Sequence, residues 1–301
     1  MKLAKTSFGS WAFAFGPFAT NPYTFEEVLK FASDNGFDAI EINGFRPHPH
    51  ADDHDTAAGW APLKSMIRDQ YGLEISAIAG DFRCAPPSQV SKDTYMKEFR
   101  KSLEMCKHLG TSMTRVDTIV PPNALTSDEY KARFDNLIEN WSAAADLARE
   151  YDVVITWEFE PILWINKPKE IITVLDTINH PNFKVMFDTA HAHMISVVGQ
   201  HQVGEKDTHP GGIIGFAQQL GDHIAHWHLI DCVEDDQLDD GNSIHSPFGT
   251  GAIDFVGFFS AMKEPLEKAP YWTFDFCSCP TTAEDGKDAI PFIKKIVAQV
   301  D

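Results

Sequence analysis

Strand-like and helix-like segments alternate along the whole length of this chain. The strand-like runs are short and apolar, and most are bounded by polar or turn-forming residues. They lie near residues 5–13, 38–42, 73–79, 112–117, 152–158, 183–187, 224–230 and 271–276. Eight strands, each followed by a helix, match the element count of a (β/α)8 barrel. The alternation therefore predicts an α/β fold built as a single (β/α)8 TIM barrel.

The stretches between these runs carry the signals of helix starts and stops. Thr24 and Glu27 form a capping signature that opens the first helix, and Gly36 closes it. Further helices are expected over residues 91–109, 126–150, 168–178, 211–221, 254–268 and 286–298. A doubly wound sheet is the alternative, but the turn after the first strand lacks the glycine-rich phosphate motif typical of that fold. We expect one domain over residues 1–301, and the long loops fall at 43–59, 199–210 and 231–250.

The composition argues against several classes of partner. The chain has 301 residues, of which 43% are hydrophobic, enough for a large core. Its 25 basic and 44 acidic side chains give a formal charge of −19, which opposes nucleic acid or an anionic membrane as a partner. No apolar segment approaches the ~20 residues that cross a bilayer, and residues 11–15 are interpreted as first strand rather than secretory signal. Five cysteines without disulfide-like spacing indicate a reducing cytoplasm.

Acidic and imidazole side chains stand at the ends of the last four strand-like runs. Glu158 and Asp275 lie in apolar or aromatic runs, where a carboxylate is costly unless it is paired or bound to metal. Asp188 ends another run, and His226 and His228 are two residues apart, so they face the same side of a strand. Three carboxylates with one imidazole suit a divalent ion such as Mn²⁺ or Mg²⁺. A metal-free acid–base site is the alternative, but its carboxylates would repel one another.

Other polar residues near these ends admit two interpretations each. His191 and His193 follow Asp188 where a loop is expected, and they either extend the site or are ordinary polar loop residues beside an aspartate that caps the next element. Arg46 and His50 either line a polar pocket or belong to a solvated loop.

Four more residues are also open to a structural interpretation. Glu160 lies two residues after Glu158 and would face the same side of a strand, but Pro161 suggests that the strand has already ended. Arg115 and Asp117 indicate a buried ion pair at the barrel mouth. His226 is alternatively a hydrogen-bonded core histidine.

Four motifs in the second half of the chain occur together. They are Asp188-Thr189-Ala190-His191, Glu158 with Glu160-Pro161, His226-Trp227-His228, and the glycine-rich turn of residues 248–254. In this combination the chain resembles the xylose-isomerase-like TIM-barrel superfamily. That superfamily includes sugar isomerases, ketose 3-epimerases and endonuclease-IV-type repair enzymes.

The resemblance implies one divalent metal ion held as in the ketose 3-epimerases. The implied ligands are Glu158, Asp188, His228 and Asp275. Mn²⁺ is the expected ion, with Mg²⁺, Co²⁺ and Zn²⁺ as alternatives. Asp275 stands where relatives carry glutamate, which shortens its reach as a base. Substrate contacts are expected from His191, His193, His226, Glu160, Arg46 and His50.

The implied function is metal-dependent isomerisation or epimerisation of a small keto- or aldo-sugar, or an inosose, through a metal-stabilised enediolate. Glu158 and Asp275 would exchange the proton. Ligands for only one ion are recognised, which favours proton transfer over hydride shift. The alternatives are a lyase or deglycosidase acting on 3-keto-glycosides and a non-catalytic metal- or sugar-binding barrel. His245 could serve a repair nuclease, but the charge of −19 opposes a DNA substrate. A cytoplasmic homo-oligomer is compatible with the sequence.

Overall fold

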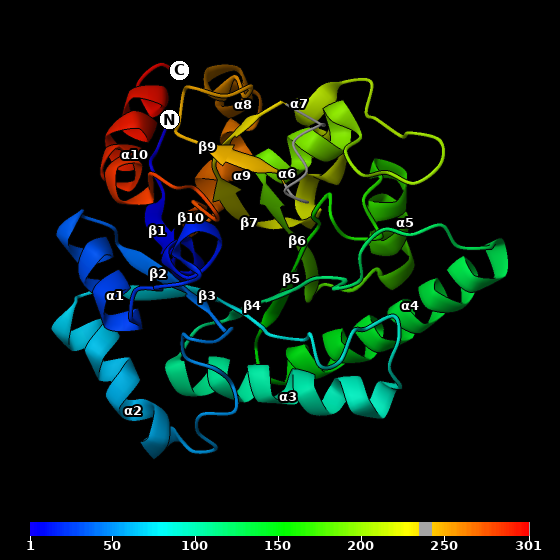
Figure 1. Ribbon diagram of the computed structural model, residues 1–301, viewed down its shortest axis with the longest axis horizontal. Helices are drawn as coiled ribbons and strands as arrows, with labels where there is room; N and C mark the ends of the chain where they lie inside the picture. Colours follow the sequence, from blue (N-terminus) through cyan, green and yellow to red (C-terminus); the bar gives the residue numbers. More distant parts are fainter. Residues whose placement is uncertain (235–242, 301) are drawn as a thin grey trace.

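Eight parallel strands close into a barrel in the computed structural model, which describes residues 1–234 and 243–300 (Figure 1). The strands are β1 (Lys5–Gly9), β2 (Ala39–Asn43), β3 (Glu74–Ala79), β4 (Met113–Val116), β5 (Val154–Glu158), β6 (Phe183–Asp188), β7 (Ile224–Leu229) and β10 (Tyr271–Phe274). They pair in the cyclic order β1-β10-β7-β6-β5-β4-β3-β2. The (β/α)8 barrel expected from the sequence is confirmed.

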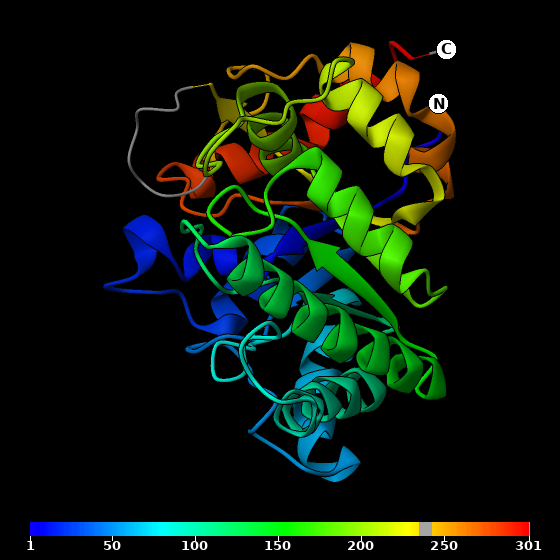
Figure 2. The same ribbon diagram turned by 90° about the vertical axis from the view of Figure 1, so that its right-hand side faces the viewer.

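Helices surround the barrel and cover its outer face. They are α1 (Phe25–Asp34), α2 (Ala57–Ser65), α3 (Lys92–Leu109), α4 (Ser127–Glu150), α5 (Pro168–Ile178), α6 (Thr189–His193), α7 (Gly212–Leu220), α8 (Phe255–Ala261), α9 (Lys263–Lys268) and α10 (Thr282–Val297). Thr24 and Thr126 cap α1 and α4 as reciprocal capping boxes, and Ser91 caps α3. Figure 2 shows α3, α4 and α5 following one another along one side, where each packs against the next.

The first strand ends sooner than the sequence suggested. β1 stops at Gly9, and a 3₁₀ helix, η1 (Ser10–Phe13), follows in place of the strand expected up to residue 13. The indole of Trp11 folds back over Gly9, where an added Cβ would lie 2.4 Å from a ring carbon of Trp11. A glycine is therefore required at this close approach, and the fold-back carries Trp11 to the barrel mouth.

The chain also turns helical immediately after β6. Asp188 is the N-cap of α6, and a π-helical turn, η4 (Met194–Val198), follows. His191 and His193 thus lie on a helix and not in the loop that the sequence suggested. The last helix, α10, begins at Thr282, four residues before the expected start at 286.

The expected loop at 231–250 contains a small antiparallel pair, β8 (Asp231–Val233) and β9 (Ile244–Ser246). The Asp231 carboxylate joins the start of β8 to the chain after β9. It accepts hydrogen bonds from the backbone N–H groups of Cys232, Gly249, Gly251 and Ile253 at 2.9–3.1 Å. A Cβ on Gly251 would lie 2.4 Å from an Asp231 oxygen, so glycine is needed there.

Two further observations bear on the expectations from sequence. All five cysteines are free thiols. Among residues 1–234 and 243–300, none of the helices combines the length and the apolar character needed to cross a bilayer.

Candidate active site

Four side chains from neighbouring strands converge at the carboxyl end of the barrel. They are Glu158 at the end of β5, Asp188 at the end of β6, His228 in β7 and Asp275 directly after β10. Each has a ligand-capable atom, and these atoms all lie within 4.8 Å of one another. All four residues are buried, and the most exposed, Asp275, has only 4% of its surface accessible. The structure thus brings together the four residues that the sequence analysis proposed as ligands.

The polar atoms of this group fit a divalent cation. Asp188 Oδ1 accepts a hydrogen bond from the backbone N–H of His191 at 2.7 Å and so caps α6. Its other oxygen, Oδ2, is buried, as are Glu158 Oε1 and His228 Nδ1, and none of these atoms has a hydrogen-bond partner in the described part of the chain. The last two lie 2.8 Å apart without hydrogen-bond geometry. Buried polar atoms left in this way are costly unless a cation satisfies them.

Electrostatics within the group point the same way. Burial raises the pKa of the Asp188 carboxyl well above its usual value, and the carboxylates of Asp275 and Glu158 raise it further. Burial also acts to raise the pKa of Glu158, but Arg115 and His228 outweigh it and lower that pKa to about 2. Close carboxylates that oppose one another's ionisation are stabilised by a cation, so the donor set suits a divalent ion.

Arg115 places a positively charged side chain beside two of the buried carboxylates. Its guanidinium donates hydrogen bonds to Glu158 Oε2 and, at 3.3 Å, to Asp117 Oδ2. The expected Arg115–Asp117 pair is therefore present, but the arginine also fixes a proposed metal ligand. One oxygen of Glu158 is held by this contact, and the other is left for the site.

Asp275 is held from the opposite side of the mouth. Its Oδ1 accepts hydrogen bonds from Trp11 Nε1 at 2.6 Å and from the backbone N–H of Cys277 at 2.8 Å. Burial acts to raise the pKa of Asp275, but neighbouring His245 and His228 outweigh it and lower that pKa. Asp275 is thereby kept ionised and fixed in orientation.

His228 is oriented from below by a buried glutamate. Its Nε2 lies 3.1 Å from Glu41 Oε2, an atom that also contacts His226 Nε2 at 2.9 Å and Thr273 Oγ1 at 2.8 Å. Burial acts to lower the pKa of His228, but Glu41 and Glu158 outweigh it and raise the pKa well above its usual value. His226 and His228 face the same side of β7, as their spacing predicted.

A cavity of about 230 Å³ opens onto this group. Glu158, Glu160, His191 and Asp275 are among its lining residues, whereas Asp188 and His228 are not. The remaining wall is made by Trp11, Phe15, Asn43, Phe45, Ala79, Arg83, Arg115 and Cys277. Burial lowers the pKa of His191 to about 3, so its imidazole is neutral at ordinary pH. The cavity thus gives a small polar molecule access to two of the four proposed ligands.

Four of the residues expected to contact substrate lie elsewhere. His226 is fully buried inside the barrel, where Glu41 binds it. His193 is turned toward Glu234, with 3.6 Å between His193 Nε2 and Glu234 Oε1.

The two residues from the loop after β2 are also displaced from the cavity. Arg46 pairs with Asp53 at the surface. His50 Nδ1 lies 3.5 Å from Asp52 Oδ2, and His50 Nε2 lies 3.8 Å from Asp81 Oδ2. Arg46 thus fits the solvated-loop interpretation, whereas the His50 side chain is only 18% exposed and lines a different, smaller cavity.

A second set of ligand-capable atoms overlaps the first. Asp188, His191, His245 and Asp275 also bring such atoms within 4.8 Å of one another. His245 Nδ1 lies 3.7 Å from Asp275 Oδ1, and His191 Nδ1 lies 2.6 Å from Ser243 Oγ. The two sets share Asp188 and Asp275, and His245 joins them from β9.

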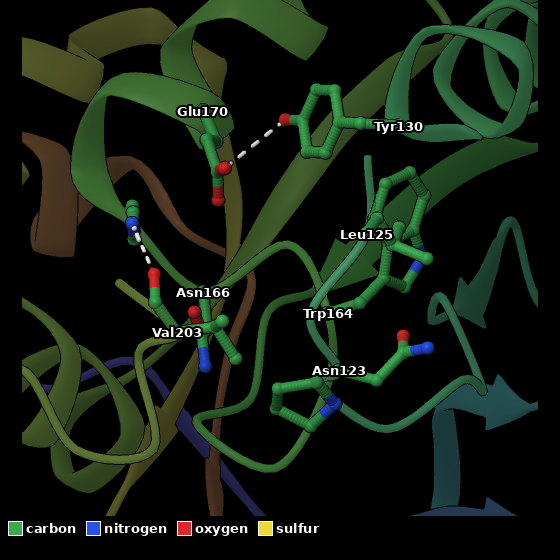
Figure 3. Close-up of a pocket in the computed structure, with 9 residues that line it drawn as sticks. Asn123, Leu125, Tyr130, Trp164, Asn166, Glu170 and Val203 are labelled. Carbon is green, nitrogen blue, oxygen red and sulfur yellow. Dashed lines mark hydrogen bonds between the residues drawn. The ribbon is translucent and has the colours of Figure 1, made fainter. Parts of the chain in front are cut away.

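A separate cavity of about 180 Å³ lies among the loops that follow β4, β5 and β6 (Figure 3). Tyr130 donates a hydrogen bond to Glu170 Oε1 at 3.1 Å, and Lys167 Nζ donates one to the carbonyl of Val203 at 2.8 Å. None of the four proposed ligands is among its lining residues. This cavity is therefore distinct from the candidate site.

Sequence reasoning missed the roles of two residues that hold the site. Glu41 stands between Ile40 and Ile42, which is the same signal of a charge in an apolar run that identified Glu158. Trp11 lies in a run that the sequence analysis interpreted only as first strand, and its hydrogen bond to Asp275 spans 264 residues of sequence.

Comparison with known proteins agrees with this geometry. The chain is 27% identical over 100 residues to the inosose isomerase of Bacillus licheniformis, a match that spans 33% of this chain and about a third (35%) of that protein's length. It is 21% identical over 220 residues to the fructoselysine 3-epimerase of Escherichia coli O157:H7, covering 68% of this chain and 71% of that one.

The fold is similar to that of a solved structure described as the IOLI protein with a binding zinc atom. The TM-score is 0.70 at 20% identity, covering 98% of this chain and 96% of the other. The family described as xylose isomerase-like TIM barrel matches residues 29–271. Since that match extends from α1 to β10, the chain belongs to the xylose isomerase-like TIM-barrel family.

Proposed function

We propose that this protein is a divalent-metal-dependent isomerase or epimerase of a small keto- or aldo-sugar, or an inosose. The observation that carries the proposal is the division of labour among the four converging residues. All four have ligand-capable atoms in one group, but only Glu158 and Asp275 also line the cavity. Two carboxylates that face the substrate space are the arrangement needed to remove and return a proton.

The ion proposed here is Mn²⁺, Zn²⁺ or another divalent metal held by Glu158, Asp188, His228 and Asp275. When bound, it would act as a Lewis acid toward the substrate's carbonyl and neighbouring hydroxyl. The donor set is mixed oxygen and nitrogen, which suits these ions. The zinc atom bound by the similar IOLI protein supports a divalent ion without fixing its identity.

The chain's own residues would carry the proton. Glu158 is ionised at neutral pH because its pKa is lowered to about 2, and Asp275 is ionised for the same kind of reason. Such carboxylates are weak bases, so the carbon that loses its proton must be acidified by an adjacent carbonyl. A ketose, an aldose or an inosose meets that condition. His191, a neutral imidazole on the cavity wall, would hydrogen-bond a substrate oxygen.

Turnover of a panel of sugars and inososes in D₂O tests the proposal. We expect deuterium to enter at the carbon next to the carbonyl. His191→Ala should retain the metal while losing substrate affinity or turnover. Metal bound without exchange or product across the panel would indicate a non-catalytic barrel, and release of an aglycone from a 3-keto-glycoside would indicate a lyase or deglycosidase. Product without deuterium would contradict the enediolate route.

A further inference from the structure

Glu41 is a fully buried carboxylate in the middle of β2, and it is not among the residues that line the cavity. Its Oε2 receives three side-chain contacts, from His226, His228 and Thr273, at 2.8–3.1 Å. A carboxylate inside a barrel costs several kcal/mol in desolvation unless it is paired. Its contact with His228, a proposed metal ligand, suggests a role in orienting that histidine.

The two ring nitrogens of His228 face different surroundings. Nε2 faces Glu41 Oε2, whereas Nδ1 lies 2.8 Å from Glu158 Oε1 and 3.6 Å from Asp275 Oδ2. A carboxylate only accepts hydrogen bonds, so contact with Glu41 requires the proton on Nε2. A metal-bound imidazole is neutral, and with its proton on Nε2 its lone pair is on Nδ1, directed at the other ligands.

We propose that Glu41 is a positioning residue of the metal site, which fixes His228 in the tautomer and rotation that present Nδ1 to the divalent cation. The role rests on the proposed function, because it requires the metal site. Carboxylates that accept the second N–H of a metal-bound histidine orient the ring in this way.

The other two contacts of Glu41 complete the arrangement. His226 and Thr273 approach the same oxygen from β7 and β10, and so fix where that oxygen lies. His226 itself lies 3.0 Å from Thr273 Oγ1. The first histidine of the His-x-His motif therefore supports the glutamate that orients the second, and does not meet the substrate.

A purely structural role is the rival explanation, in which Glu41 only satisfies polar groups of the core. Glu41→Gln separates the two, with Thr273→Val as a matched control. Thr273→Val removes a hydrogen bond to the same oxygen, has nearly the same shape and leaves the contact with His228 intact. Zn²⁺ affinity, measured by competition with a chromogenic chelator, is the readout, and unfolding curves in chelator report the structural cost.

We expect Glu41→Gln to weaken Zn²⁺ binding by about 10- to 100-fold, the usual loss when such a partner is removed. Thr273→Val should weaken it by less than about tenfold, while lowering stability in chelator. Parent-level affinity in Glu41→Gln would overturn the proposal, as would equal losses in both variants. Ligand-capable atoms of Glu41, His226 and His228 also lie within 4.8 Å of one another. Two Zn²⁺ ions per parent chain and one in Glu41→Gln would therefore also overturn the proposal, because Glu41 would then be a ligand.

Nitrogen-15 spectra of histidine side chains in the Zn²⁺-loaded parent give a second measurement that needs no variant. His228 should carry its proton on Nε2 and the metal on Nδ1, and the reverse assignment would overturn the proposal. None of these measurements depends on turnover. If the parent binds Zn²⁺ and meets these expectations but no sugar exchanges deuterium, the proposed function fails and the role of Glu41 stands.

Discussion

The two halves of the barrel mouth contribute different chemistry. The half formed by β5, β6, β7 and β10 supplies the converging acids and imidazole. The half formed by β1, β2 and β4 supplies the groups that hold them. Trp11 donates to Asp275, Arg115 donates to Glu158, and Glu41 accepts from His228.

Asp188 is the exception, since its partner is the backbone of its own helix. Each half alone would be unstable, because one gathers buried charge and the other offers unused donors and an acceptor. The site therefore depends on barrel closure, which places side chains from distant parts of the sequence at bonding distance. Changes in the ligand half should abolish metal binding, whereas changes in the supporting half should only weaken it, or alter stability or rate.

The largest expected effect comes from Asp188→Asn. The amide can still accept the hydrogen bond that caps α6, but the charge toward the metal is lost. We expect metal affinity to fall by more than the ~100-fold typical of losing an outer partner. Elemental analysis after dialysis measures it, and Asp188→Ala shows whether loss of the cap adds to the effect. Metal content equal to that of the parent would contradict the proposed ligand set.

Arg115→Met should produce the next largest effect, on stability. Glu158 and Asp117 would both lose their buried counter-charge, and breaking such a pair costs about 3–5 kcal/mol. Denaturant unfolding in the presence of chelator is the measurement. The double variant Arg115→Met/Glu158→Gln should recover part of the loss. If the single variant is as stable as the parent, the supporting half does not stabilise the acids.

Trp11→Phe should have a smaller effect, on rate. The ring is retained, but the 2.6 Å hydrogen bond to Asp275 is lost. Because a hydrogen bond to a charged group contributes about 1.5–3 kcal/mol, we expect turnover to fall by about tenfold or more. Metal should remain, since Cys277 N–H still holds the same oxygen. Unchanged kcat with the true substrate would show that Asp275 needs no support from Trp11 in η1.

The smallest expected effect concerns pH and lies in the loop after β2. His48 is buried, its nitrogens lie 3.3 Å from Ser10 Oγ and the Tyr23 carbonyl, and burial lowers its pKa below 6.5. A lowered pKa means that the unfolded chain gains the proton first, so stability is full above pH 6.5 and falls as the pH drops below it. His48→Gln should flatten this fall, measured as unfolding free energy in chelator between about pH 7.5 and 5.5. A slope identical to the parent's would contradict this.

The barrel and its ligand half were predictable from sequence because both follow local patterns. A strand run broken by one acid, such as Ile155 to Glu158, shows burial and charge together. The supporting half depends on contacts between residues far apart in the chain, which no local pattern encodes. Glu41 is the instructive case, since its local signal equals that of Glu158, yet its role follows only from its contact with His228. The β8–β9 pair was missed because its strands have three residues each.

The backbone hydrogen bonds that the Asp231 carboxylate accepts have a consequence for how this family could diversify. These four contacts tie the start of β8 to the chain that follows β9, so the two ends of the intervening segment meet whatever lies between them. Lengthening a segment whose ends are already joined adds little to its closure entropy. Sequences of different length can then replace one another between Val233 and Ile244. Ser243 at its edge contacts His191, so such exchanges would change the surroundings of a residue on the cavity wall.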